Sequence, residues 1–206
     1  MAEREFLEPS AKRRTTARIR AVEAGTSIEV VVAVRRRAAR HLASSMMLGA
    51  VLAVLTLAIM WFSPTVYDVR TMPLDALAAF ALGVLVAFLF PGVRRLLTPR
   101  ALLRTAAERG ARRAFAELGV EKTRDRVGLL VYVALFEREV VLLPDQGVPA
   151  DLVQQGLAEA RGELERAVRK LHFDAFEAAL EKIGPPASAA VPRRLDDENE
   201  LCDDVA

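Results

Sequence analysis

Three acidic residues in the second half of the chain are its candidates for chemistry. Asp145 follows a short apolar run, and loops at strand ends carry the functional residues of many α/β proteins. Together with Asp125 and Glu137, it could supply the hard oxygen ligands that Ca²⁺ or Mg²⁺ prefers. The alternative is structural, because Asp145-Gln146-Gly147 has the composition of a turn and Glu137-Arg138 could simply close a hairpin. In a hairpin, Asp125 and Glu137 would lie at different ends.

The rest of the chain contains no recognisable catalytic motif. It has no P-loop, no G-x-S-x-G, no dinucleotide-binding glycine pattern and no Cys/His cluster with zinc spacing. The two histidines, His41 and His172, suit interfacial or packing positions. The single cysteine, Cys202, excludes an internal disulfide and suits a reducing compartment. We therefore expect either no cofactor or Ca²⁺ alone.

The hydrophobic residues are concentrated in one part of the chain. They make up 52% of the 206 residues, mean hydropathy is +0.21, and most of the excess lies between Leu42 and Val93. The formal net charge is only +2, which argues against a nucleic-acid-binding protein. This composition predicts a membrane-anchored protein whose remaining residues suffice for one soluble domain.

Two uncharged runs predict a transmembrane hairpin. Residues 42–62 carry no charge, and at about 1.5 Å per residue such a helix spans a bilayer core of about 30 Å. A second transmembrane helix is predicted over residues 74–93, and the short connection between the two makes them antiparallel. Trp61, Phe62 and Tyr67 lie at the connecting end, as interfacial aromatic residues do.

Basic residues flank the predicted hairpin on the side of both chain termini, against Arg70 alone in the connecting loop. By the positive-inside rule, both termini and the soluble domain are expected to be cytoplasmic. Each helix also carries small residues at every fourth position, which either close the hairpin or mediate homo-oligomerisation. The flanking basic residues are Arg35, Arg36, Arg37, Arg40, Arg94, Arg95, Arg100 and Arg104, and the small-residue stripes are Ser45, Gly49 and Ala53, and Ala79, Gly83 and Ala87.

The segments on either side of the hairpin predict one α/β domain. Ser10 is a plausible cap for a helix over residues 10–24, and the β-branched run 27–34 predicts a strand, which its continuous apolar character suggests is central. The partner strands of this run must come from beyond the transmembrane hairpin. There, a helix is expected over residues 102–118, ended by Gly119. The apolar runs 127–136 and 140–143 then predict a β-hairpin. Two or three further helices follow, ended by Gly184 and the prolines after it.

The expected fold class is therefore α/β, a small mixed sheet with packing helices and an inserted two-helix transmembrane hairpin. The first helix and strand occupy residues 1–35, the hairpin 42–93, the remainder of the domain 101–184, and an acidic tail 185–206.

Several short motifs, in order, resemble the TPM-domain family, and most closely its bacterial YgcG-like membrane-protein branch. That branch has a T-x-x-R-x-G entry to a strand, an E-R turn, a D-x-G-I after the next strand and an N-E-L-P-D ending. The resemblance covers roughly residues 23–204. The matching residues are Thr123, Arg126, Gly128, Glu137, Arg138, Asp145, Gly147, Asn199, Glu200 and Leu201, with Cys202 at the usual proline.

The resemblance implies a small α/β domain with helices on a short mixed sheet, and a protein of the bacterial inner membrane. Relatives have been linked to acid phosphatase activity, photosystem II repair and modulation of a receptor channel, and several bind calcium through acidic residues. We expect a non-enzymatic adaptor module that binds an unknown protein partner at the cytoplasmic face of the membrane. The alternative is a weak metal-dependent phosphatase that uses Asp145 and its neighbours.

Overall fold

The computed structural model describes residues 2–39, 41–65 and 67–194, which divide into two compact units. We call the residues up to Ala39 and from Leu103 onward the α/β unit, and the residues between them the hairpin unit. The predicted flanking residue Arg40, the acidic stretch from residue 195 and the motif residues Asn199, Glu200 and Leu201 lie outside the described part of the chain.

The α/β unit is built on a three-stranded mixed sheet in the order β1-β2-β3. Strand β1 (Glu29–Arg35) pairs in parallel with β2 (Gly128–Ala134), which is antiparallel to β3 (Glu139–Pro144). Thus β1, which precedes the hairpin unit in the sequence, pairs with a strand that follows it. Together with the packing helices and the two apolar helices of the hairpin, this sheet confirms the expected fold class.

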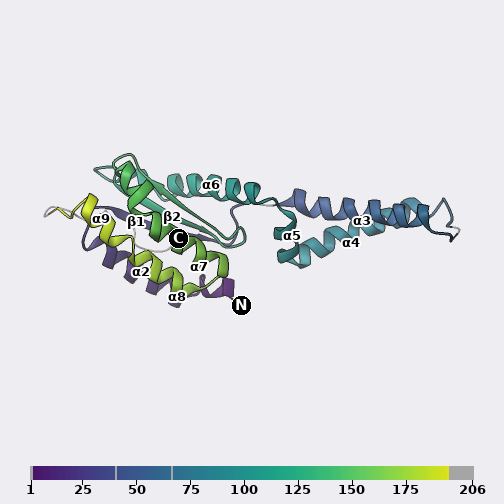
Figure 1. Cartoon of the computed structure of the whole chain (residues 1–206), viewed down its shortest axis with the longest axis horizontal. Helices are drawn as coiled ribbons and strands as arrows, with labels where there is room; N and C mark the ends of the chain where they lie inside the picture. Colours follow the sequence, from purple (N-terminus) through teal and green to yellow (C-terminus); the bar gives the residue numbers. More distant parts are fainter. Residues whose placement is uncertain (1, 40, 66, 195–206) are drawn as a thin grey trace. The chain divides into compact units, whose positions relative to one another are not determined.

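Helices cover both faces of the sheet (Figure 1). Val30, Val32 and Val34 of β1 belong to a core shared with α2, α7, α8 and α9, whereas Val31 and Ala33 face α6. These helices are α2 (Pro9–Glu23), α6 (Arg100–Glu117), α7 (Ala158–Lys170), α8 (Phe173–Glu181) and α9 (Gly184–Ala190). Short elements complete the unit: α1 (Ala2–Glu5), η1 (Val120–Lys122) and η2 (Leu152–Gly156).

This layering corrects one prediction about the first strand. Among the described residues, β1 is an edge strand and β2 is the central one. The uninterrupted apolar run of β1 arises because its side chains are buried on both faces of the sheet, and not because strands pair with both of its edges.

Two helix boundaries differ from expectation because of proline. Helix α2 begins at Pro9 with Glu8 as its N-cap, so Ser10 lies inside the first turn, where its hydroxyl donates to Glu8 Oε2 at 3.3 Å. Gly184 begins α9, and Pro185 and Pro186 lie in its first turn and do not end the helical region, since proline is well tolerated there. Residues 185–190 of the predicted tail are therefore helical. Gly119 ends α6 with a φ of 66°, as predicted.

The hairpin unit contains two long apolar helices packed against each other, α3 (Leu42–Phe62) and α4 (Met72–Leu89). Both are long and apolar enough to span a membrane. The predicted second span ends earlier than residue 93, because Pro91 has no amide hydrogen to continue α4 and instead starts α5 (Pro91–Leu97). The small-residue stripes meet inside the hairpin, where Ser45, Gly49, Gly83 and Ala87 are buried.

Candidate functional site

Asp145 anchors the loop that follows β3. Its side chain is only 3% exposed, and its backbone N–H donates to Gly128 O at 2.8 Å, which extends the pairing of β2 and β3 by one step. The carboxylate accepts hydrogen bonds from Arg126 Nε at 3.0 Å and from a second nitrogen of the same guanidinium at 3.3 Å. Oδ1 also accepts from the backbone N–H of Gln146 at 2.7 Å. Three donors thus converge on one buried carboxylate.

This pairing has an electrostatic consequence for Arg126. The hydrogen bond to Asp145, reinforced by the negative charge of Asp145, raises the pKa of the Arg126 guanidinium above its usual value. The guanidinium is half exposed, whereas the carboxylate is buried. Because both oxygens of Asp145 already accept hydrogen bonds, the geometry favours the turn interpretation of this residue over that of a metal ligand.

The other motif residues of this region pack around the same loop. Arg126 has a φ of 56°, and the N–H of Gly147 donates to Arg126 O at 2.8 Å. A Cβ at Gly147 would lie 2.3 Å from Asp125 O, so only glycine fits between the two loops. A Cβ at Gly128 would lie 2.6 Å from Val120 O, and Thr123 is 4% exposed. These motif residues therefore share one packed end of the sheet.

The three candidate metal ligands are not brought together. Asp125 forms an ion pair with Arg194. Glu137 lies beyond the other end of β2, about 20 Å away for a seven-residue strand. In the described ranges, no group of three or more His, Cys, Asp or Glu side chains could hold a metal ion.

Glu137 is a buried structural anchor for the segment that leaves β1. Its side chain is 2% exposed and accepts hydrogen bonds from the backbone N–H groups of Ala38, at 3.1 Å, and Ala39, at 3.4 Å. The neighbouring Arg138 adopts a φ of 55° and donates to Arg169 O at 2.9 Å. The Glu137-Arg138 pair does close the β2–β3 hairpin, but it also fastens the segment after β1, a contact that sequence spacing does not reveal.

The basic residues predicted to flank the hairpin have different surroundings. Arg35 is the last residue of β1, and the Arg37 guanidinium lies 5.7 Å from the centre of the Phe136 ring. Arg94 is buried, with its guanidinium 6.0 Å from the centre of the Phe88 ring, and Arg104 pairs with Glu108 at 3.2 Å. Arg36, Arg95 and Arg100 are at least partly exposed.

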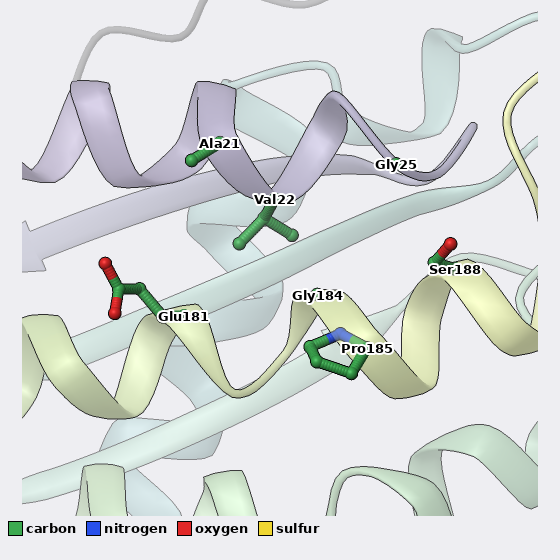
Figure 2. Close-up of a pocket in the computed structure, with 7 residues that line it drawn as sticks. All are labelled: Ala21, Val22, Gly25, Glu181, Gly184, Pro185 and Ser188. Atoms are coloured by element: carbon green, nitrogen blue, oxygen red, sulfur yellow. The ribbon is translucent and has the colours of Figure 1, made fainter.

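A shallow pocket of about 290 Å³ lies between the end of α2 and the junction of α8 and α9 (Figure 2). Val22 forms its floor and Pro185 one wall, and Figure 2 shows the Ser188 hydroxyl directed towards Gly25 on the opposite side. Glu181, at one end, forms an ion pair with Arg18. The pocket is lined by Ala21, Val22, Gly25, Glu181, Gly184, Pro185 and Ser188.

Sequence patterns do not reveal this pocket. They mark Gly25 and Gly184 only as residues that end helices. The available signal is that small residues end α2 and begin α9, which leaves space between two helices that are otherwise closely packed.

No family model matches the chain, and no curated protein matches it either. One solved structure does.

The fold resembles that of the BA42 protein. BA42 comes from the psychrophilic bacterium Bizionia argentinensis, and its structure was determined by NMR. The TM-score is 0.55 and the sequence identity 18%, and the match covers 98% of this chain and 95% of the BA42 chain. BA42 is a TPM-like domain protein, so this likeness supports the fold that the sequence motifs implied. At this identity the likeness concerns the fold alone.

Proposed function

We propose that the protein is a membrane-anchored TPM-like module of the YgcG-like branch, which binds a protein partner at the cytoplasmic face of the bacterial inner membrane. The observation that carries the proposal is the outward surface of the hairpin. Only 17% of the most apolar 18-residue stretch of α3 is buried inside the structure, and only 11% of the corresponding stretch of α4. Large apolar side chains therefore cover the outside of both helices.

The energetics of that surface support lipid as its environment. Apolar surface left in water costs about 25 cal/mol per Å² relative to burial, and soluble monomers rarely expose extended apolar patches. The exposed residues include Met46, Val54, Leu55, Ile59, Leu77, Leu82, Leu85 and Phe88. Ser45, Gly49, Gly83 and Ala87 of the two small-residue stripes are buried between the helices, so in the closed hairpin they do not contribute to this outer surface.

The charge distribution supports the orientation. Trp61 and Phe62 are 82% and 85% exposed at the connecting end of the hairpin, and the arginines are concentrated at the other end. In this orientation the α/β unit is cytoplasmic and the connection faces the periplasm.

Cys202 makes the topology directly testable, because it is the only cysteine in the chain. A membrane-impermeant maleimide should label Cys202 only after the membrane of spheroplasts is permeabilised. The variant Cys202→Ser with Ser63→Cys should be labelled in intact spheroplasts. The reverse pattern would refute the orientation, and release of the wild-type protein from membranes by alkaline carbonate would refute the anchor.

We place the partner contact in the pocket of Figure 2, since it combines an apolar floor with a carboxylate and a hydroxyl. Ala21 is exposed at its rim, so Ala21→Trp should fill the pocket without disturbing the core. Ala116 is likewise an exposed alanine, on α6, and Ala116→Trp is the matched control. After crosslinking in native membranes, the amount of partner captured by Ala21→Trp should be several-fold lower than that captured by the wild type. Ala116→Trp should capture as much as the wild type. Equal capture by the two variants would exclude the pocket.

A further inference from the structure

Helix α5 presents an apolar stripe immediately after the second long apolar helix. Val93 and Leu96 lie three residues apart in α5, a spacing that puts them on the same side of the helix, and Phe90 is the N-cap residue that precedes it. Their side chains are 57%, 37% and 86% exposed. A stripe of large apolar residues on a short helix requires an apolar environment, or it leaves that surface in water.

The same segment is strongly basic. Residues 76–107 contain Arg94, Arg95, Arg100 and Arg104 and no Asp or Glu. Arg94 is folded back against the hairpin, over Phe88, whereas Arg95 is partly exposed and Arg100 is exposed. The segment therefore combines an exposed apolar stripe with positive charge, as helices that lie in a membrane interface do.

Hydrogen bonds hold α5 at the base of the hairpin. Thr98 Oγ1 donates to Arg94 O at 2.8 Å. Since a hydroxyl has only one proton, the 2.7 Å contact between Ser44 and Thr98 has Ser44 as its donor. This chain of bonds links the start of α3 to the end of α5, so the position of α5 relative to the two long helices is defined.

The length of α4 sets the depth at which α5 begins. Its 18 residues extend about 27 Å, close to the thickness of a bilayer core of about 30 Å. The helix then breaks at Phe90, so in an inserted hairpin α5 would start at the level of the lipid headgroups.

We propose that α5 is an interfacial helix that binds anionic phospholipid. Phe90, Val93 and Leu96 insert among the acyl chains, while Arg95 and Arg100 contact headgroup phosphates. Anionic headgroups are preferred over zwitterionic ones because no neighbouring ammonium offsets their negative charge. Each arginine near an anionic surface should contribute about fivefold in binding. This inference rests on the proposed membrane insertion.

The test uses the full-length protein in nanodiscs of phosphatidylcholine mixed with phosphatidylglycerol, followed by native mass spectrometry of the lipids that remain bound. The wild-type protein should retain phosphatidylglycerol above its bulk share. The double variant Arg95→Gln, Arg100→Gln should lose this preference by about 25-fold, as two arginines are removed. Arg70→Gln, at the opposite end of the hairpin, is the matched control and should retain it. The proposal would be overturned if the wild-type protein retained phosphatidylglycerol only at its bulk share. It would also be overturned if the double variant kept the wild-type preference.

Two further measurements distinguish insertion of the hairpin from lipid binding by α5, and bound lipid from free phosphate. Trp61 is the only tryptophan, and quenching of its fluorescence by brominated acyl chains reports insertion of the hairpin independently of lipid charge. Absence of quenching would refute the anchor itself, whereas quenching without a phosphatidylglycerol preference would refute only the role of α5. Soluble glycerol phosphate should not displace the bound lipid, and displacement would indicate a site for free phosphate and overturn the interfacial role.

Discussion

Gly83 packs directly against Gly49 in the hairpin unit, so closely that a Cβ at Gly83 would lie 2.7 Å from the Gly49 Cα. A Cβ at Gly49 would in turn lie 2.8 Å from Phe80 O. The two helix backbones meet at this point, as small residues in membrane helices allow. The contact assigns the small-residue stripes to closure of the hairpin itself.

Gly83→Ala should therefore destabilise the hairpin. The added methyl meets backbone atoms that can move only if the helices separate, and overpacking of this kind costs about 1 to 3 kcal/mol. Thermal unfolding of the detergent-solubilised protein measures the effect. A Cβ at Gly92 would meet no atom within 4 Å, so Gly92→Ala is the matched control and should leave the melting temperature nearly unchanged. Equal effects of the two changes would contradict the observed packing.

In the α/β unit, Gly110 of α6 packs on Tyr132 of β2. A Cβ at Gly110 would lie 2.4 Å from the Tyr132 hydroxyl oxygen, so Gly110→Ala should lower the free energy of unfolding by about 1 to 3 kcal/mol. In a Tyr132→Phe background the loss should be smaller, because the hydroxyl is gone, and a double-mutant cycle measures the coupling. Gly162 of α7 faces open space, so Gly162→Ala should instead raise the free energy of unfolding, because alanine has a higher helix propensity than glycine. Additivity of the Gly110 and Tyr132 changes would show that this contact does not form.

The two aspartates of the motif region should differ in their contribution to stability. The side chain of Asp145 is 3% exposed and accepts three hydrogen bonds, whereas that of Asp125 is 47% exposed. Asp145→Asn replaces one acceptor oxygen by a donor that faces the Arg126 guanidinium, so it should destabilise the protein clearly. Asp125→Asn should remain within about 0.5 kcal/mol of the wild type. Chemical unfolding of both variants measures this difference in the free energy of unfolding. A larger loss in Asp125→Asn than in Asp145→Asn would contradict the structural role of Asp145.

The ion pairs between α2 and α8 should make stability depend on pH. The hydrogen bond from Arg14 lowers the pKa of Asp174 below its ordinary value of about 3.9. A carboxyl whose pKa is lower in the folded state contributes stability above its unfolded pKa and loses that contribution as pH falls. The stability difference between the wild type and Asp174→Asn should thus be full at neutral pH, begin to decline near pH 4 and vanish only when the pH has fallen below the lowered folded-state pKa. A difference that persisted into strong acid would exclude the pair as its source.

Local patterns predicted those elements whose residues are neighbours in the sequence. The hydropathy of residues 42–62 matched the limits of α3, and Gly119 ended α6 as expected. The β2–β3 hairpin also followed from two apolar runs separated by a few residues. In each case a short stretch of chain contains the whole physical cause, either uniform hydropathy or a turn.

Contacts between distant residues were not predictable in this way. The two hydrogen bonds from the Arg126 guanidinium to Asp145 join residues 19 positions apart, and Glu137 accepts from backbone N–H groups about 100 residues earlier in the chain. The pocket between α2 and α9 depends on how two helices from opposite ends of the chain pack. No local periodicity encodes such pairings, because each depends on which surfaces the completed core brings together.

The sequence by itself determined that the chain has two apolar helices with basic flanks and a small mixed α/β domain, because hydropathy and β-branched runs act over short distances. Only the tertiary structure decided that, among the described residues, β1 is an edge strand buried on both faces, and that Glu137 holds the segment after β1 while Asp145 holds the loop after β3. The physical reason is the parallel pairing of β1 with β2 across the inserted hairpin. That pairing brings Ala38 and Ala39 to Glu137, whereas the antiparallel pairing of β2 with β3 places Asp145 and Glu137 at opposite ends of the sheet.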